Sequence, residues 1–331
     1  MPNRCTHCIM PEVEGHIQLD AGGLCNLCAK YREAGAGQSP AAAEGLPELL
    51  GKVDALRGAS TGPYDCLAAL SGGKDSTMAL HIAVKQLGLK PLAVFIDNGF
   101  CIEAMYRNVK NATDSLGVDL VTFKPRLIKD LFRHLLKSGS RVYFCRICNA
   151  LIDYYIRQFA LQHGIQLLIS GHTKGQEFLK GTELFWIYRA SDAALLEAIK
   201  DRPEFSLVAE MFASLTLYFH RRFGSLTLLS PFHYLDYEES DILATITHDL
   251  GYCLPEISWP AGSTNCLFNF VCQKLTVEWF GYSQHEAEIS MLVRRGEMTR
   301  QRALEIIETP ITRNDIALAL DCIGLAPDAI L

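Results

Sequence analysis

Two pairs of cysteines near the N-terminus have the spacing of a metal site. Each pair has the form Cys-x-x-Cys, and sixteen residues separate the pairs, which are formed by Cys5, Cys8, Cys25 and Cys28. Four thiolates with this spacing favour tetrahedral zinc, each pair forming one side of the ligand shell. Four unrelated buried thiols are the alternative. Because a closed shell leaves no coordination position for a substrate, we predict a structural zinc ribbon.

A glycine-containing turn farther along the chain has the residues of an anion site. An apolar run at 66–70 leads directly into Ser-Gly-Gly-Lys-Asp-Ser at 71–76, and helical apolar spacing follows. Glycines at such a turn let backbone amides face an anion at the helix N-terminus, where the helix dipole favours negative charge. The GxxxxGK[ST] pattern of a Walker A loop is absent. The alternative to a phosphate site is an ordinary capped turn.

Three further cysteines could meet near this turn. Cys145 and Cys148 form a third Cys-x-x-Cys at the start of a predicted helix, whose dipole should lower both thiol pKa values. Cys266 precedes another predicted helix in a turn-rich segment. The pair alone is compatible with a zinc knuckle, a redox pair, a cluster site or buried thiols. The other cysteines are expected mostly in the core, although Cys253 or Cys272 could replace Cys266 as a ligand.

The elements that must position these residues alternate between strands and helices. Apolar runs indicate strands at 66–70, 91–96, 119–123, 166–170 and 226–230. Helical spacing covers 101–116, 126–138 and 149–163. This order predicts an α/β fold with a doubly wound, mainly parallel sheet. Ligands of such sheets bind at the carboxyl ends of the strands, where the 71–76 turn, Asp97 and His172 should converge.

The hexapeptide at 71–76 resembles the PP-loop of the N-type ATP pyrophosphatases, the adenine nucleotide α-hydrolase superfamily, over roughly residues 60–275. Members split ATP between the α and β phosphates and adenylate a carbonyl-like oxygen, so that nitrogen or sulfur can displace AMP. The resemblance implies that Lys74 adds positive charge to the pyrophosphate and that Asp75 lies near Mg²⁺. It implies that the pyrophosphate itself is held by Ser71, Gly72, Gly73 and Ser76.

The same resemblance extends to two later segments. Asp97 matches the acidic position that lies by the adenine or ribose in the family. Gly171-His172-Thr173 resembles the family's GHT segment. Without the PP-loop, His172 would be interpreted as an imidazole that is solvated or caps a helix. With it, Asp97, Gly171 and His172 join the predicted ATP site.

The pattern of Cys145, Cys148 and Cys266 resembles the iron–sulfur branch of the PP-loop sulfurtransferases, such as the 2-thiocytidine and 2-thiouridine tRNA synthetases. The resemblance implies a [4Fe–4S] cluster on these three cysteines, with a fourth iron free to hold sulfide. It implies an ATP-dependent sulfurtransferase, supplied by sulfide or a sulfur carrier, whose catalytic residues are Lys74, Asp75 and the three cysteines. The expected cofactors are ATP, Mg²⁺, Zn²⁺ and the cluster.

The two ends of the chain resemble another branch. CTHCIMPE…GLCNLC at the N-terminus and RRGEMTR at 294–300 are similar to segments of the N-acetyl sugar amidotransferases. Those enzymes use the same adenylation but receive ammonia from a separate glutaminase subunit. This alternative gives the three central cysteines no role, so we rank sulfur transfer first. A nucleotide sensor without enzymatic activity is a third hypothesis.

Composition bears on the compartment and the acceptor. The 331 residues include 31 Lys and Arg against 37 Asp and Glu, and this balance excludes a generally basic nucleic-acid coat. We expect a cytoplasmic protein, since no apolar run is long enough to cross a membrane, no signal peptide is visible and the cysteine pairs suit metal ligands.

Basic residues between 120 and 150 raise the question of an RNA acceptor. This segment holds seven Lys or Arg, of which Lys129, Arg133 and Lys137 share one helical face. The stripe could contact phosphates or be a solvated face. Because the rest of the chain is acidic and carries no recognisable RNA-binding accessory, we favour a small-molecule acceptor slightly over tRNA.

These patterns divide the chain into four parts. They are a zinc ribbon at 1–33, a linker and helix at 34–60, a PP-loop domain at 61–275 and a helical C-terminal region at 276–331. A helical insertion at about 173–224, with helices at 189–200 and 204–222, could wall a substrate pocket or serve packing. We expect a homodimer without membrane contact.

Overall fold

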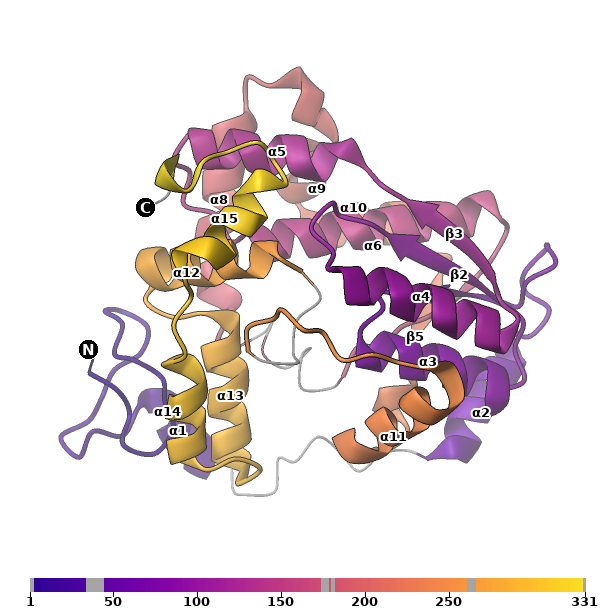
Figure 1. Cartoon of the computed structure of the whole chain (residues 1–331), viewed down its shortest axis with the longest axis horizontal. Helices are drawn as coiled ribbons and strands as arrows, with labels where there is room; N and C mark the ends of the chain where they lie inside the picture. Colours follow the sequence, from indigo (N-terminus) through magenta and orange to yellow (C-terminus); the bar gives the residue numbers. More distant parts are fainter. Residues whose placement is uncertain (1–2, 34–44, 174–178, 180–181, 261–265, 330–331) are drawn as a thin grey trace.

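The computed structural model describes residues 3–33, 45–173, 179, 182–260 and 266–329 (Figure 1). The predicted linker at 34–44 therefore lies outside the described residues, as does part of the predicted insertion. Within the described ranges no helix is long and apolar enough to cross a membrane.

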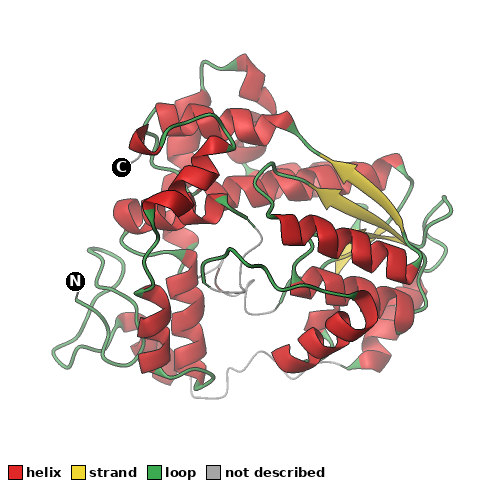
Figure 2. Ribbon diagram, viewed as in Figure 1, coloured by secondary structure: helices red, strands yellow, loops and turns green. Residues whose placement is uncertain are grey.

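The described strands form one all-parallel sheet in the order β3-β2-β1-β4-β5. Figure 2 shows strands of this sheet in yellow among the helices in red. Their bounds are β1 Cys66–Ala69, β2 Pro91–Ile96, β3 Asp119–Phe123, β4 Leu167–Ile169 and β5 Thr227–Leu229. The five predicted strands are confirmed within one residue at each end. The order places β1 at the centre, where the direction of strand addition reverses and where open α/β sheets bind ligands.

Helices cover both faces of this sheet, which explains its continuous apolar strands. One face packs against helices that bury Ala93 and Phe95 of β2; they are α2 Leu46–Leu56, α3 Lys74–Lys85, α4 Glu103–Leu116 and α11 Glu239–Leu250. The other face buries Leu92 and Val94 against α6 Phe144–Gln162 and α10 Leu215–Phe223. The doubly wound α/β fold is confirmed.

A second core lies beside the sheet. It joins the N-terminal ribbon, including α1 Asn26–Glu33, to the helix after β3, to helices of the insertion and to the helices that follow residue 267. These helices are α5 Arg126–Lys137, α8 Phe185–Ile199, α9 Ser206–Ala213, α12 Phe268–Phe280, α13 Gln284–Arg295, α14 Arg300–Ile307 and α15 Arg313–Asp321. Figure 1 shows the N-terminal segment beside α13 and α14. The ribbon and the C-terminal helices are thus packed as one body of apolar side chains.

Some predicted helix bounds differ from those observed. The single helix predicted at 204–222 is two helices, α9 and α10, because Ser214 has extended backbone angles between them. The helix predicted at 149–163 begins earlier, at Phe144, so Cys145 and Cys148 both lie in its first turns. The predicted boundary at residue 276 falls inside α12.

Candidate functional site

The 71–76 turn is shaped by glycine at the centre of the sheet. Gly72 has a φ of +78°, and a Cβ on it would lie 2.5 Å from the carbonyl oxygen of Met105. Only glycine fits this position without strain. The hydroxyl of Ser71 lies 2.9 Å from that of Ser76, which donates to the carbonyl of Gly73 at 3.1 Å. The loop is therefore fixed against the N-terminus of α3, where an anion is favoured.

A buried asparagine that the sequence analysis missed, Asn108, is hydrogen-bonded to the backbone of the 71–76 turn. Asn108 of α4 is 1% exposed, and its Nδ2 donates to the carbonyl of Gly72 at 3.0 Å and to that of Cys253 at 2.9 Å. The amide of Cys253 donates back to Asn108 Oδ1 at 2.8 Å. Asn108 thus joins the turn to the segment after α11, and Cys253 has a backbone role there.

The charged residues of the turn are partly exposed. Lys74 Nζ lies 3.1 Å from Asp75 Oδ1 and 3.8 Å from Glu239 Oε1, with the Lys74 and Asp75 side chains 27% and 28% exposed. A cation at the first turn of α3 can reach an anion bound over the loop.

The end of β4 lies against the same helix N-terminus. A Cβ on Gly171 would lie 2.6 Å from the amide nitrogen of Ser76. Glycine is required here because the two backbones approach so closely. His172 is exposed, with Nδ1 3.2 Å from the hydroxyl of Ser170, and its carbonyl accepts a bond from Ser230 at 2.5 Å. The structure therefore brings Gly171 and His172 to the predicted phosphate turn.

Asp97 follows β2 and is 3% exposed. Its Oδ1 accepts from the amide of Gly99 at 2.7 Å, and its Oδ2 accepts from Tyr106 at 2.8 Å and pairs with Lys124 at 2.8 Å. Burial alone would raise the pKa of Asp97, but these three donors together lower it. Both carboxylate oxygens thus have protein partners, so Asp97 anchors the end of β2. Its contact with adenine or ribose stays a prediction.

The three central cysteines line one pocket of about 210 Å³. Cys145 and Cys148 come from the start of α6, and Cys266 lies just ahead of α12. The backbones of Cys266 and Cys101 form an isolated antiparallel β-bridge, which holds the Cys266 segment against the loop after β2. The pocket is also lined by Asn98, Phe132, Tyr143, Asn149, Ile152, Phe268, Asn269, Gln273, Gln284 and His285. The fold thus brings Cys148 and Cys266 into one pocket, although more than a hundred residues separate them in the sequence.

Asn98 bridges two of these cysteines and was missed by the sequence analysis. Its Oδ1 accepts from the amide of Phe100 at 2.9 Å, which fixes the orientation of the side-chain amide. Its Nδ2 then lies 3.4 Å from Cys148 Sγ and 3.7 Å from Cys266 Sγ. An amide donor shared by two sulfurs would stabilise thiolate ligands at this place. The motif Asp-Asn-Gly after β2 was the available signal.

Burial changes the thiol chemistry that the sequence predicted. It raises the pKa of Cys148 to about 12 and that of Cys266 to about 11. A hydrogen bond to Cys272, with burial, raises the pKa of Cys145. The predicted lowering of the Cys145 and Cys148 pKa values by the helix dipole is therefore wrong, since burial outweighs the dipole in the absence of a metal.

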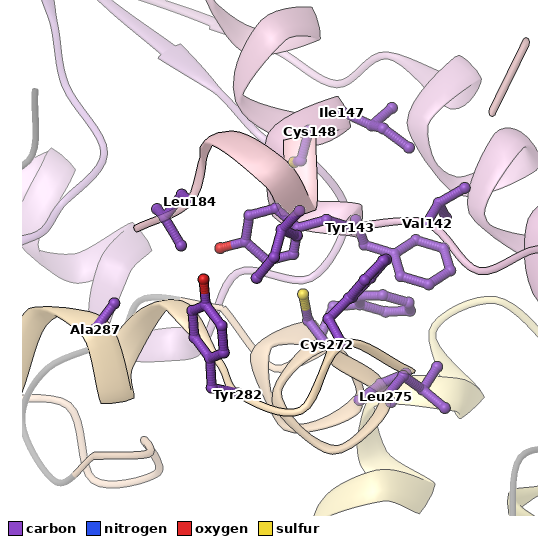
Figure 3. Packing of buried hydrophobic residues seen from close by; sticks show 14 of the residues in the cluster. Val142, Tyr143, Ile147, Cys148, Leu184, Cys272, Leu275, Tyr282 and Ala287 are labelled. Atoms are coloured by element: carbon purple, nitrogen blue, oxygen red, sulfur yellow. The ribbon is translucent and has the colours of Figure 1, made fainter. Parts of the chain in front are cut away.

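Cys272 is a fourth sulfur near the pocket. It is fully buried on α12, and the Cys145 and Cys272 sulfurs lie 3.3 Å apart. Figure 3 shows Cys272 next to Tyr143 among apolar side chains. Cys272 is a core residue, as expected, but it is also in contact with one of the predicted ligands.

The N-terminal cysteines fit a single metal ion. The sulfurs of Cys5, Cys8, Cys25 and Cys28 all lie within 4.8 Å of one another, and all four residues are buried. In the described part of the chain, no other set of three or more Cys, His, Asp or Glu meets this criterion. This geometry fits tetrahedral zinc. The pocket cysteines stand farther apart, as they would around a cluster in which each thiolate binds a different iron.

The ribbon is covered by the C-terminal helices. The guanidinium of Arg294 lies 3.8 Å from Cys8 Sγ and pairs with Glu183, and both side chains are buried. Arg300 Nε donates to the carbonyls of Cys5 and Cys8 at 3.1 and 3.0 Å. The RRGEMTR segment therefore has a visible role, which is to hold the ribbon.

Helix α13 supplies a wall of the pocket that the sequence analysis did not assign. Tyr143 donates to Gln284, and Gln284 Nε2 donates to Glu288 at 2.6 Å. His285 Nδ1 lies 3.0 Å from the other oxygen of Glu288. The capping box of Ser283 and Glu286 marks where this helix begins and was a readable signal.

Basic residues of the 120–150 segment are partly engaged within the protein. Lys124 pairs with Asp97, and Arg133 donates to the carbonyl of Ile323 at 2.6 Å. Arg146 makes two bonds to Asp192 of α8, at 2.7 and 2.6 Å. Arg146 therefore ties the Cys145–Cys148 turn to the insertion, whose helix α8 supports the pocket region.

Comparison with known proteins finds similarity in the central part of the chain and, more weakly, over most of its length. Residues 65–191 match the family model of the phosphoadenosine phosphosulfate reductase domain. The chain is 27% identical over 255 residues to an uncharacterized protein of Methanocaldococcus jannaschii, covering 77% of this chain and 76% of that protein. It is 31% identical over 101 residues to one of the subunits of the glutamine-hydrolyzing GMP synthase of Sulfurisphaera tokodaii, covering 30% and 27%.

Two solved structures are similar to this chain at low sequence identity and low TM-score. One is the U34-tRNA thiolase NcsA of Methanococcus maripaludis with its [4Fe–4S] cluster, with a TM-score of 0.38, 16% identity and coverage of 93% of this chain and 90% of that one. The other is a predicted subunit of tRNA methyltransferase from Methanocaldococcus jannaschii, with a TM-score of 0.32, 14% identity and coverage of 67% and 90%. The resemblance to the PP-loop superfamily, inferred from residues 71–76, is confirmed by the match of residues 65–191.

Proposed function

We propose that this chain is an ATP-dependent sulfurtransferase that adenylates an acceptor oxygen, releases pyrophosphate and replaces the oxygen with sulfur. The observation that carries the proposal is the meeting of Cys145, Cys148 and Cys266 in one pocket. The family match over 65–191 supports the nucleotide half of the reaction. The amide donor of Asn98 between two of the sulfurs supports the sulfur half.

The PP-loop residues have a defined part in the first step. The backbone turn from Ser71 to Gly73 would hold the pyrophosphate part of ATP, and Lys74 would balance the charge that grows on it. Asp75 would bind Mg²⁺. Lys74 is near enough to the pocket wall for its charge to lower the pKa of Glu288.

The three pocket cysteines would hold a [4Fe–4S] cluster, which would supply an open iron position for sulfide. The four ribbon cysteines would hold zinc with a structural role only. We propose a small-molecule acceptor, because Lys124, Arg133 and Arg146 have partners within the chain.

Nitrogen transfer is the second candidate. The specific observation in its favour is the 31% identity of 101 residues to a subunit of a glutamine-hydrolyzing synthase. In that case ammonia from a glutaminase subunit would displace AMP, with an N-acetyl sugar as acceptor.

The test begins with anaerobically purified protein. Wild type should contain about one zinc with roughly four irons and four sulfides per chain. Cys148→Ala should lose the iron and keep the zinc, whereas Cys322→Ala, a matched change on α15's C-cap, should keep both. Zinc without iron after reconstitution would contradict sulfur transfer and favour the nitrogen candidate.

Pyrophosphate release then tests the adenylation step. It should appear with ATP and one of three probes: uridine, bulk tRNA or an N-acetylated nucleotide sugar. Lys74→Ala and Asp75→Ala should lower it about 100-fold or more without loss of metal. Absence of pyrophosphate release with every probe would favour the nucleotide-sensor hypothesis. Loss of metal in the Lys74→Ala or Asp75→Ala variant would contradict the role in ATP binding that we assign to these two residues.

A further inference from the structure

A histidine–carboxylate pair lies on the α13 wall of the cysteine pocket. His285, in the first turn of α13, lines the pocket together with Cys145 and Cys148. Its Nδ1 is 3.0 Å from Oε2 of Glu288, and the two side chains are 12% and 24% exposed. A partly buried imidazole in such a pair is a common general acid or base.

The surroundings of Glu288 fix which nitrogen of His285 carries the proton. Burial alone would raise the pKa of Glu288, but its bonds to His285 and Gln284 and the charge of Lys74 lower it. An ionised carboxylate only accepts hydrogen bonds, so Nδ1 of His285 must donate. In the neutral ring, Nε2 is then left with a lone pair. The edge contact with Trp259, at 5.7 Å between ring centres, limits rotation of the imidazole.

Other titratable groups face the pair from several elements. They are Tyr143 just before α6, Cys145 and Cys148 on α6, Tyr188 on α8, Cys266 before α12 and Lys74 on α3. The three cysteines are assigned to metal binding in the proposed function, so they are not available as proton acceptors in this step. Among the pocket-lining side chains that the structure describes, His285 carries the one imidazole, a nitrogen base held beside a carboxylate.

We propose that His285, oriented by Glu288, is the general base of the transfer step. This inference rests on the proposed function of the site. The sulfur of a hydrosulfide ion forms a bond to the adenylated carbon of the acceptor, and the bond from that carbon to the AMP oxygen breaks. AMP leaves with the electron pair of that bond. The S–H proton passes to Nε2 of His285, which leaves the product in its thiolate–thione form. With ammonia as nucleophile, an N–H proton would pass to the same atom.

The first test needs no turnover. In protein labelled with ¹⁵N-histidine, NMR should show His285 as a neutral ring with the proton on Nδ1, the tautomer that is less common in water. Its signal is assigned by its loss in His285→Gln, and Glu288→Gln should remove the tautomer preference. His248→Gln is the matched control, because His248 is an exposed histidine beside Asp249 on α11. A doubly protonated His285 at pH 7, or one protonated on Nε2 alone, would overturn the proposal.

The second test separates the two half-reactions. With the probe that elicits pyrophosphate release, His285→Gln should keep ATP–pyrophosphate exchange within about threefold while transfer to sulfide falls about 100-fold. Glu288→Gln should show the same split with a smaller loss, and His248→Gln should behave as wild type. Unchanged transfer, or equal loss of both half-reactions, would overturn the assignment of His285. Lack of pyrophosphate release by wild type would instead overturn the proposed function, while the tautomer result would still decide the protonation of His285.

Discussion

The ribbon and the pocket use the same Cys-x-x-Cys motif in opposite ways. In the ribbon, four sulfurs lie within 4.8 Å of one another, all fully buried, and backbone amides of the same turns bond to them, as with Met10 to Cys8 at 3.4 Å. In the pocket, Cys145 and Cys148 lie on a helix and share a cavity of about 210 Å³ with Cys266. One site is closed and the other is open to a ligand.

The difference teaches that the motif alone does not decide the role of a cysteine pair. Backbone amides of the ribbon's own Cys-x-x-Cys segments donate to ribbon sulfurs, as His7 does to Cys5 and Cys28 does to Cys25. Two of the pocket cysteines, Cys148 and Cys266, accept hydrogen bonds from a side chain of another element, Asn98. A local shell suits a structural ion, whereas a shell assembled from distant elements leaves space for substrate.

The largest effect expected is that of a ribbon ligand on the fold. Cys8→Ser should release the zinc and lower the melting temperature by about 10 °C or more, because zinc binding in such sites is also folding free energy. Cys148→Ser should keep the zinc and melt within about 3 °C of wild type, while losing pocket metal. Calorimetry with metal analysis checks both. Similar melting of the two variants would break the comparison between a closed and an open site.

The second largest effect on stability is expected from the buried ion pair of Arg294 and Glu183, which lies over the ribbon. Arg294→Met leaves Glu183 buried without its cation, which should cost about 3–5 kcal/mol of unfolding free energy in urea. The double change Arg294→Met with Glu183→Gln should recover much of that loss, because no charge is left uncompensated. A single variant as stable as wild type would mean that the ribbon does not depend on α13.

Replacement of a glycine in the 71–76 turn should weaken ATP binding more than it lowers the stability of the fold. Gly72→Ala places a Cβ against the Met105 carbonyl and strains a φ of +78°, so we expect a loss of about 2 kcal/mol and much weaker ATP binding. Gly88→Ala is the control, since its φ is +59° but nothing lies within 4 Å of the added Cβ. It should lose about 1 kcal/mol and keep ATP affinity by calorimetric titration. Equal ATP affinity in both variants would contradict the role of the turn.

The smallest expected effect is the pH dependence of the stability that the Asp97 carboxylate contributes. Since the folded pKa of Asp97 is lowered, its stabilisation is present above the unfolded pKa, about 3.9, and is lost as pH falls through the folded pKa. Asp97→Asn should therefore be less stable than wild type by about 1 kcal/mol at pH 7, with the difference shrinking below about pH 4. Asp114→Asn, an exposed partner of Lys110, should show little change. A constant difference across pH would exclude the ionised carboxylate as its cause.

Much of the fold could be predicted because its signals are local. The strands are continuous apolar runs, and the ribbon ligands lie within 24 residues of each other. The residues of the pocket were harder to predict from the sequence. Asn98, Gln284 and His285 are ordinary polar residues. The Asp-Asn-Gly motif and the capping box beside them indicate local structure, but not the role that these residues gain from what the chain places opposite them. The misjudged thiol pKa values have the same origin, since burial is a property of the tertiary structure.

Periodicity and spacing encode local geometry, so the sequence was enough to predict the parallel sheet, the glycine turn at 71–76 and the N-terminal group of four cysteines. The tertiary structure alone decided that α13 faces the cysteines, that Asp97 is occupied by Lys124, Tyr106 and Gly99, and that Arg294 holds the ribbon. These contacts join residues far apart in the chain, and packing of two separate cores brings them together.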